Sequence, residues 1–267
     1  MKMISSLLCV LSLLFIGVCD AETKTKFFEN GKKESEANYK DGEKHGLEIW
    51  WHLNGRKQAE LNWKHGKQHG LSRGYYYYDE YAKLKKSSEN NYKDGKRHGL
   101  STGYFGNGKK SNEANYKDGK KHGMETWWDE KGRKRRKTPY VDGKRHGLEI
   151  WWNAHGRKWS EVNWKDGKIV FATVWKPNGS KCSLTNLKDG NGVWVSYYGN
   201  GKKLRETNYV DSKKHVVTTF HENGRKCTED NWKDGERRHG LDTRWDKAGN
   251  ITDQSKWENG EEVEVIK

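Results

Sequence analysis

Strand-like stretches in which apolar, aromatic and polar residues are interspersed follow one another along this chain, and each stretch ends at a turn that contains glycine. Residues 106–128 show the pattern best: a turn at Gly108, a stretch that ends with Tyr116, a turn at Gly119 and a stretch that ends with Trp128. Asn-Gly and Asp-Gly pairs between such stretches are strong signals of a β-hairpin, because both residues tolerate the positive φ angles of a two-residue type I′ loop. No stretch repeats apolar residues at helical spacing.

The hairpin pattern is periodic. The second-turn glycine recurs, in most cases, every 22 to 25 residues, at Gly42, Gly66, Gly95, Gly119, Gly143, Gly167, Gly190, Gly235 and Gly260, with Ser212 where one more is expected. About ten units lie between residues 27 and 260, and in the third unit residues 79–86 replace the first turn, which predicts a local loop. The period therefore predicts an all-β fold, an elongated antiparallel β-hairpin repeat array, as one repeat domain over residues 22–267.

One face of this array is expected to carry a ladder of aromatic rings. If the loop at Asp41-Gly42 has an even number of residues, Tyr39 and Ala37 share a face with Gly46 and Trp50. Gly46, the glycine of a recurring His-Gly pair, then lies diagonally across from Tyr39. A one-residue bulge would exchange the faces on one strand. The ladder either holds a single-layer sheet together or binds a ligand. The candidate binding face comprises Tyr39, Trp50, Trp63, Tyr92, Tyr116, Trp127, Tyr140, Trp151 and Trp164.

Composition limits the kind of protein this can be. Hydrophobic residues make up 31% of the chain and charged residues 33%, with a net charge of +15. This is too little apolar surface for a deep closed core, whereas 14 Trp and 13 Tyr in periodic positions indicate an ordered, thin structure. No catalytic or phosphate-binding motif interrupts the array. The sequence therefore predicts a protein that is not an enzyme and has no cofactor.

Basic residues stand near almost every turn, and five of them are consecutive: Arg133, Lys134, Arg135, Arg136 and Lys137. This basic patch is either a solvated strand after the turn at Gly132 or a binding site. The long positive field would attract an acidic protein, an acidic glycan or an anionic lipid surface. Nucleic acid is not expected as a partner, because the N-terminal residues, described below, are typical of a signal for export from the cytoplasm.

The histidines and cysteines could suggest a metal site or a disulfide. His45, His69, His98, His122, His146 and His239 each precede a glycine at the same repeat position. Equivalent residues of adjacent units lie about 9.6 Å apart in a regular ribbon, too far for a shared metal ion. We therefore expect no metal site and a cross-strand pairing of each histidine with residues such as Asn38. Cys182 and Cys227 lie two units apart, about 19 Å, so they are expected to be free thiols or to pair between molecules.

The first residues are typical of a secretory signal peptide. Lys2 is followed by an apolar run from Ile4 to Val18 and by a small-residue cleavage site at Cys19-Asp20-Ala21. We expect residues 1–21 to be removed, leaving a secreted, periplasmic or cell-surface protein with no transmembrane span. Lipid attachment at Cys19 is the alternative.

The unit from Asn115 to Gly123 resembles the variant MORN repeat found in bacterial proteins named as the YwqK family of toxin-antitoxin antitoxins, and similar strings stand at 38–46, 91–99 and 140–147. The resemblance implies an elongated hairpin ribbon that acts as a scaffold or binding array. The pattern decays between Gly167 and Val216, where the His-Gly pair is missing. Either selection for the repeat pattern has relaxed in this stretch, or the stretch has been recruited to bind a partner.

These observations favour an exported, non-enzymatic scaffold that binds an acidic protein, an acidic glycan or an anionic lipid surface. One alternative is an antitoxin-like protein that neutralises a toxin. Another is a cell-wall carbohydrate binder that uses Trp50, Trp127 and Trp151. The open edges of the array predict either capping by the charged tail at 258–267 or end-to-end association.

Overall fold

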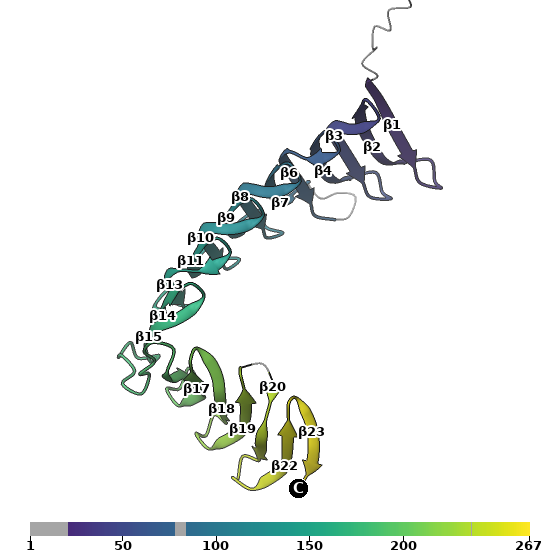
Figure 1. Ribbon diagram of the computed structural model, residues 1–267. Helices are drawn as coiled ribbons and strands as arrows, with labels where there is room; N and C mark the ends of the chain where they lie inside the picture. Colours follow the sequence, from purple (N-terminus) through teal and green to yellow (C-terminus); the bar gives the residue numbers. More distant parts are fainter. Residues whose placement is uncertain (1–20, 78–83, 236) are drawn as a thin grey trace, which may run out of the picture.

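A computed structural model describes residues 21–77, 84–235 and 237–267, and throughout these residues the chain is all-β, with no helix (Figure 1). Within each of its two sheets the strands are antiparallel and lie side by side in chain order, which confirms the predicted hairpin array. The expected signal peptide up to residue 20, with Cys19, and most of the expected loop at 79–86 lie outside the described residues. No helix in the described part of the chain is long and apolar enough to cross a membrane.

Two sheets make up the ribbon. The first, of 15 strands, contains β1 (Ala21–Phe27), β2 (Lys33–Lys40), β3 (Glu43–Trp51), β4 (Lys57–Lys64), β5 (Lys67–Gln68), β6 (Gly70–Tyr75), β7 (Lys86–Lys93), β8 (Lys96–Tyr104), β9 (Lys110–Lys117), β10 (Lys120–Trp128), β11 (Lys134–Val141), β12 (Lys144–Arg145), β13 (Gly147–Trp152), β14 (Lys158–Lys165) and β15 (Lys168–Val174). The second, of 8 strands, contains β16 (Gly192–Tyr197), β17 (Lys203–Val210), β18 (Lys213–Phe220), β19 (Lys226–Lys233), β20 (Arg237–Arg238), β21 (Gly240–Trp245), β22 (Ile251–Glu258) and β23 (Glu261–Val265).

The two kinds of turn differ. At Asp118 and Gly119 both φ angles are positive, 50° and 86°, as a type I′ turn requires, and the other Asp-Gly turns repeat this geometry. At the described first turns of the units, such as Asn107-Gly108, only the glycine is left-handed, with φ 83° at Gly108, whereas Asn259-Gly260 has two positive φ angles like the Asp-Gly turns. In the Asn107-Gly108 turn the N–H of Gly108 donates to the Phe105 carbonyl at 2.8 Å, and the N–H of Phe105 donates to the Lys109 carbonyl at 2.8 Å. The expected two-residue loop is therefore wrong for first turns such as Asn107-Gly108, which form a longer loop that ends in a left-handed glycine.

The His-Gly pair sets the register between the two strands of a unit. Lys121 pairs with Tyr116, whereas Glu125 pairs with Ala114, so β10 carries two more residues than β9 between these pairs. Gly123 lies in this extra segment with φ 92°, a conformation that favours glycine. An extra length of two residues leaves the alternation of faces unchanged, and the expected face assignment is confirmed in such units.

The position of this glycine differs from the expectation. Gly123 is directly opposite Tyr140, the ladder aromatic of the following unit, instead of diagonal to the one in its own unit. Gly46 and Trp63 form the same pair between β3 and β4, nearer the N-terminal end of the ribbon. The aromatic ring of one unit therefore covers the glycine of the unit before it.

Units without the glycine have a different register. Asn208 pairs with Val216 while Tyr209 pairs with Lys214, so the extra length on β18 is one residue. The pairing around Asn163 and Trp164 shows the same one-residue shift. The expected loss of regularity between Gly167 and Val216 is confirmed, and at these two places its cause is the absence of a residue that tolerates the left-handed conformation. Gly192, in the same stretch, keeps this conformation with φ 117° and pairs with Tyr209.

Hydrogen bonds between consecutive units hold both edges of the ribbon. The N–H of Gly119 donates to the carbonyl of Arg97 in the preceding unit at 2.8 Å, and His98 Nδ1 lies 3.3 Å from Asp118 Oδ1. Three further His–Asp pairs have the same separation, His69–Asp94, His122–Asp142 and His146–Asp166. The expected histidine pairing with residues such as Asn38 is therefore wrong, because the partner is the turn aspartate of the next unit.

The other edge uses the turn asparagines. Asn107 Nδ2 donates to the carbonyl of Glu130 in the next turn at 2.9 Å, while Asn107 Oδ1 accepts from the N–H of Lys109. The charged tail forms β23, whose exposed Glu261, Glu262 and Glu264 make the last edge acidic. An acidic edge disfavours pairing with another strand.

The ribbon bends where the two sheets meet (Figure 1). We call residues 175–191, which connect β15 to β16, the elbow. The N–H of Cys182 donates to the Val174 carbonyl at 2.7 Å and that of Asn186 donates to the Val193 carbonyl at 3.1 Å, so the elbow bonds to both sheets. Two small apolar clusters fill this joint: Val162, Ile169, Ala172 and Leu187, and Val174, Cys182 and Val195.

Candidate functional site

The face that carries Tyr39, Ala37, Glu48, Trp50 and their equivalents is here called the ladder face, and the opposite one, with Glu36 and Ile49, the clamp face. On the ladder face a cation of one unit lies over the aromatic ring of the next. Lys44 Nζ is 4.7 Å from the centre of the Trp63 ring. The same contact joins Lys24 to Tyr39, Arg97 to Tyr116, Lys121 to Tyr140 and Arg145 to Trp164. These ladder aromatics, which the sequence marked as candidate binding residues, are engaged in contacts between units, and Tyr92 stands at the equivalent position in β7.

Trp127 and Trp151, two other members of the candidate face, lie on either side of one arginine. The guanidinium carbon of Arg136 is 5.5 Å from the centre of the Trp127 ring and 5.0 Å from that of Trp151. Arg136 also forms an ion pair with Glu125 at 3.0 Å, and the Glu125 side chain is 2% exposed. Burial disfavours the ionised carboxyl, but Lys121 and Arg136 outweigh it and hold the pKa of Glu125 below its ordinary value. The arginine is thereby fixed between the two indoles.

Trp50 does not join this group. It pairs with Ser35 and Ala59 in the first units of the ribbon, several strands away from Trp127.

The five consecutive basic residues do not form one patch. Arg133 pairs with Asp129 at 2.9 Å, and Arg136 lies between the tryptophans. Arg135 lines a cavity at the elbow. Lys134 stands at the start of β11, and Lys137 lies on the clamp face, in register with Thr126 and Ile150, where other units have glutamate. The expected solvated strand is therefore correct only in part.

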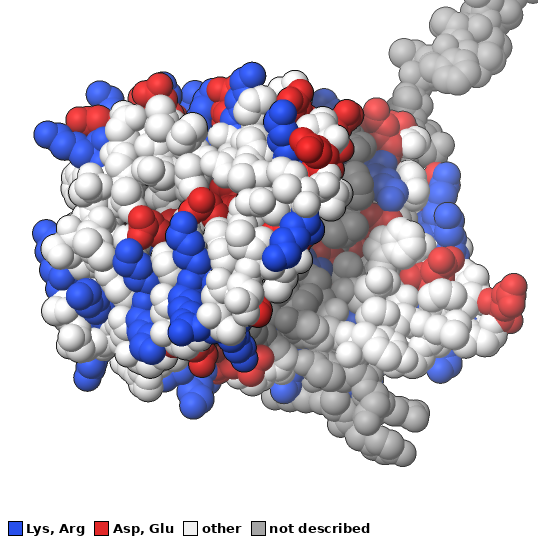
Figure 2. All heavy atoms as spheres, turned by 90° about the horizontal axis from the view of Figure 1, so that it is seen from below, with Lys and Arg blue, Asp and Glu red and all other residues white. Residues whose placement is uncertain are grey.

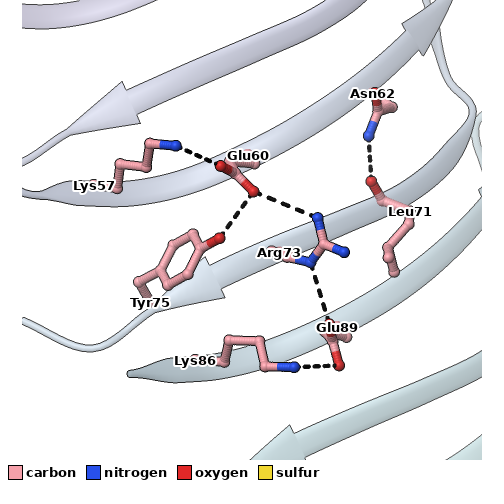
Figure 3. A network of polar contacts seen from close by, with 8 residues as sticks. All are labelled: Lys57, Glu60, Asn62, Leu71, Arg73, Tyr75, Lys86 and Glu89. Atoms are coloured by element: carbon pink, nitrogen blue, oxygen red, sulfur yellow. Dashed lines mark hydrogen bonds and ion pairs between the residues drawn. The ribbon is translucent and has the colours of Figure 1, made fainter. Parts of the chain in front are cut away.

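The clamp face is held by Lys–Glu pairs three residues apart. Figure 3 shows one stretch, in which Lys57 Nζ lies 2.7 Å from Glu60 and the Tyr75 hydroxyl donates to the same carboxylate at 2.8 Å. The Lys57 hydrogen bond is the largest cause that lowers the pKa of Glu60. Burial and the bond to Glu60 raise the pKa of Tyr75 to about 12. Arg73 connects this group to Glu89 of the next unit at 3.2 Å. The repeated charges of this face therefore stabilise the sheet.

Viewed from below, the molecule presents Lys and Arg side chains in adjacent rows, with Asp and Glu at the ends of the rows (Figure 2). This arrangement agrees with a repeat in which each unit places similar charges at similar positions. The net charge of +15 means that Lys and Arg outnumber Asp and Glu, so some cations remain without an acidic partner even though many form ion pairs.

A cavity of about 800 Å³ opens at the elbow, beside the turn at 153–157. Aromatic side chains from both sheets line it, namely Trp159, Trp175 and Tyr197, together with the cations Arg135, Arg157 and Lys176. None of its described lining residues is Asp or Glu. Such a volume is typical of ligand sites in proteins.

Trp159 connects the cavity to the tryptophan pair. Its ring centre is 5.9 Å from that of Trp151, which in turn packs on Arg136. A continuous strip of indoles and arginine thus runs across neighbouring strands from Trp127 to the cavity.

A buried thiol supports the other wall. Cys182, 3% exposed, lies 2.9 Å from the Tyr197 hydroxyl and 3.6 Å from Thr185 Oγ1. Burial opposes ionisation, yet these hydrogen bonds lower the pKa of the Cys182 thiol. Cys182 and Cys227 are both free, and no cluster of three potential metal ligands occurs among the described residues.

The sequence did not single out Trp159, Trp175, Tyr197, Arg157 or Lys176. Two signals could have found them. Trp175, Lys176 and Tyr197 lie in the stretch that lacks the His-Gly pair, and Trp159 stands where other units have a small polar residue, as at Ser87 and Ser111.

Comparisons with known proteins address the repeat. Residues 23–41, 44–65, 97–118 and 191–211 match the family described as MORN repeat variant, which supports a repeat scaffold or binding protein. No protein of curated function matches the chain.

Two solved structures cover most of this chain at low similarity. They are titled "Crystal Structure of TcdB2-TccC3-Cdc42" and "Crystal Structure of TcdB2-TccC3", and both are 11% identical with a TM-score of 0.20. They cover 88% and 91% of this chain, which spans 14% of the length of each of those chains. A similarity of this size carries no argument about function.

Proposed function

We propose that this protein is an exported, non-enzymatic repeat scaffold that binds an anionic partner at the elbow. One observation carries the proposal. The elbow cavity gathers Arg135, Arg157 and Lys176 without a carboxylate in its lining, whereas cations elsewhere on the ribbon repeatedly pair with a carboxylate, as Lys57 does with Glu60. Lys176 lies over the Tyr197 ring, 5.7 Å from its centre. Cations without a carboxylate beside them are available to a negatively charged ligand.

The charge of the whole chain supports the same proposal. A net charge of +15 produces a positive field that increases the rate at which anions meet the ribbon. An acidic protein, an acidic glycan and an anionic lipid surface all meet this electrostatic requirement.

Binding to anionic probes at increasing salt tests the proposal. The purified protein should be retained on an anionic matrix at low ionic strength and released as salt is added, since salt screens such contacts. Arg135→Ser and Lys176→Asn, which introduce residues found at equivalent positions in other units, should each weaken retention. Lys117→Ser, at the exposed end of β9, is the control with the same charge change and should have a smaller effect. Equal retention of all variants would contradict a site at the elbow.

The resemblance to antitoxins and the expected leader extend the proposal. A single acidic protein captured in a fixed ratio from the native envelope would identify a toxin-like partner, in place of a surface or a polysaccharide. Export predicts that the protein recovered outside the cytoplasm begins near Glu22. Recovery of the full chain from the cytoplasm would contradict export without affecting the binding proposal.

A further inference from the structure

The elbow cavity differs from the rest of the ribbon in both its wall and its charge. Trp159, Trp175 and Tyr197 provide flat apolar rings, and Arg135, Arg157 and Lys176 provide positive charge at the same opening. A ligand that matches this surface has apolar faces and carries carboxylates or other anionic groups on its edges. Arginine binds a carboxylate through two parallel hydrogen bonds, which also orients the ligand.

The spacing of these groups is set by the sheet. Arg135 and Trp159 occupy equivalent positions in consecutive units, so they lie two strands apart, about 9.6 Å. Trp151 lies in β13, between the strands that carry them, with its ring centre 5.9 Å from that of Trp159. Trp175, whose N–H donates to the Trp159 carbonyl at 2.9 Å, lies beside Trp159 and also lines the cavity. The elbow therefore offers a cation and two indole rings in order across neighbouring strands, a geometry that suits a short linear chain of rings.

The rings are also held in place before any ligand arrives. Trp151 packs against Trp159 on one side and Arg136 on the other, and Arg136 is anchored by the buried Glu125. Fixed side chains lose little conformational entropy on binding, which favours a stiff ligand. A bilayer surface is a poor match, because these groups line a recess and do not project from the molecule.

We propose that the elbow binds a short acidic oligosaccharide made of uronic acid residues, with sugar rings stacked on Trp159 and Trp175 and carboxylates bound by Arg135 and Arg157. This inference rests on the proposed function, since it assigns a ligand class to the same anionic site. The apolar C–H faces of pyranose rings stack on indoles, and the carboxylate at the ring edge then reaches the neighbouring guanidinium.

Calorimetric titration with uronate trimers tests this assignment. The probes are trimers of galacturonate, glucuronate and mannuronate, the methyl ester of each trimer, a triglutamate peptide, and vesicles that contain phosphatidylserine. At least one uronate trimer should bind the full-length mature protein at least ten-fold more tightly than its methyl ester and than triglutamate.

Two variants place the binding at the elbow. Trp159→Ser and Arg135→Ser should each weaken binding of that trimer ten-fold or more, and serine stands at the same repeat position in Ser87 and Ser111, so both variants are expected to fold. Lys117→Ser is the control and should bind like the unmodified protein. Circular dichroism confirms that each variant retains the β-sheet.

Other results overturn the inference in distinguishable ways. Equal binding of triglutamate or of phosphatidylserine vesicles, with no effect of Trp159→Ser, leaves an anion site and removes the sugar. Equal binding of the methyl ester removes the role of the carboxylates. Failure of every anionic probe to bind contradicts the proposed function as well.

Discussion

Replacement of Glu125 by glutamine should destabilise the ribbon strongly, because this carboxylate is buried between two cations. Its side chain is 2% exposed, Lys121 Nζ lies 2.5 Å away and Arg136 3.0 Å away. Glutamine has nearly the same shape, so the substitution removes the charge and leaves the packing almost unchanged. The two cations then lose the group that compensates them.

The structure also sets the size of the effect. Removing one partner of a buried ion pair costs about 3 to 5 kcal/mol. Arg136 and Lys121 keep 20% and 32% of their side chains accessible to solvent, so we expect the lower end, about 3 kcal/mol. Glu113, on the clamp face of β9, pairs with Lys110 and is 29% exposed. Glu113→Gln should therefore cost about 0.5 kcal/mol or less.

Urea unfolding, followed by tryptophan fluorescence and by circular dichroism, compares the two variants. The pH dependence adds a second test. Because the pKa of Glu125 is lowered on folding, its contribution is present above the ordinary carboxyl pKa and is lost as pH falls through the lowered value. Glu125→Gln should therefore be less sensitive to acid than the unmodified protein. Equal losses for Glu125→Gln and Glu113→Gln would refute the reasoning.

Three further predictions concern the turns, the clamp face and the elbow. The pKa values of Tyr75 and Tyr104 are raised from 10.0 to about 12, so both should ionise late in an ultraviolet titration. The stability that they contribute below pH 10 should be lost as the pH rises through 12. Ionisation of all tyrosines near pH 10 would contradict this prediction. Gly123→Ala should lower the free energy of unfolding by about 1 to 2 kcal/mol through backbone strain at φ 92°. The added Cβ would lie 3.7 Å from Asn115, so no steric clash adds to this strain. A neutral effect would show that the register does not depend on this residue. In a thiol titration of the native protein, Cys227 should react first and Cys182 only on unfolding, and equal rates would show that the elbow core is open.

The repeat made most of the fold predictable. Asp-Gly pairs such as Asp118-Gly119 predict a type I′ turn from local sterics, and their period alone orders the strands. The two-residue offset at Gly123 could not be read in the same way, because a bulge of one residue or two depends on whether the strand can adopt a left-handed conformation. The histidine partners were also missed, since His98 bonds to Asp118 of the following unit, a contact that depends on how the turns stack.

The candidate site was harder to predict. Trp151 and Arg135 were recognised by residue type, but their neighbours Trp159 and Lys176 come together only because the elbow bends the ribbon. The stretch that lacks the His-Gly motif contains part of the cavity lining, but the missing motif does not show its shape. Residue type also did not show that ladder aromatics such as Tyr116 contact a cation of the preceding unit, here Arg97.

The central claim is that repeated residues hold the units together and that binding occurs where the repeat is broken. Nuclear magnetic resonance of the indole N–H groups, in the presence of the tightest-binding anionic probe, tests it most directly. We expect the probe to shift the resonances of Trp151, Trp159 and Trp175 and to leave those of Trp63 and Trp232 unchanged. Shifts spread along the ladder, or shifts at Trp63 alone, would contradict the claim.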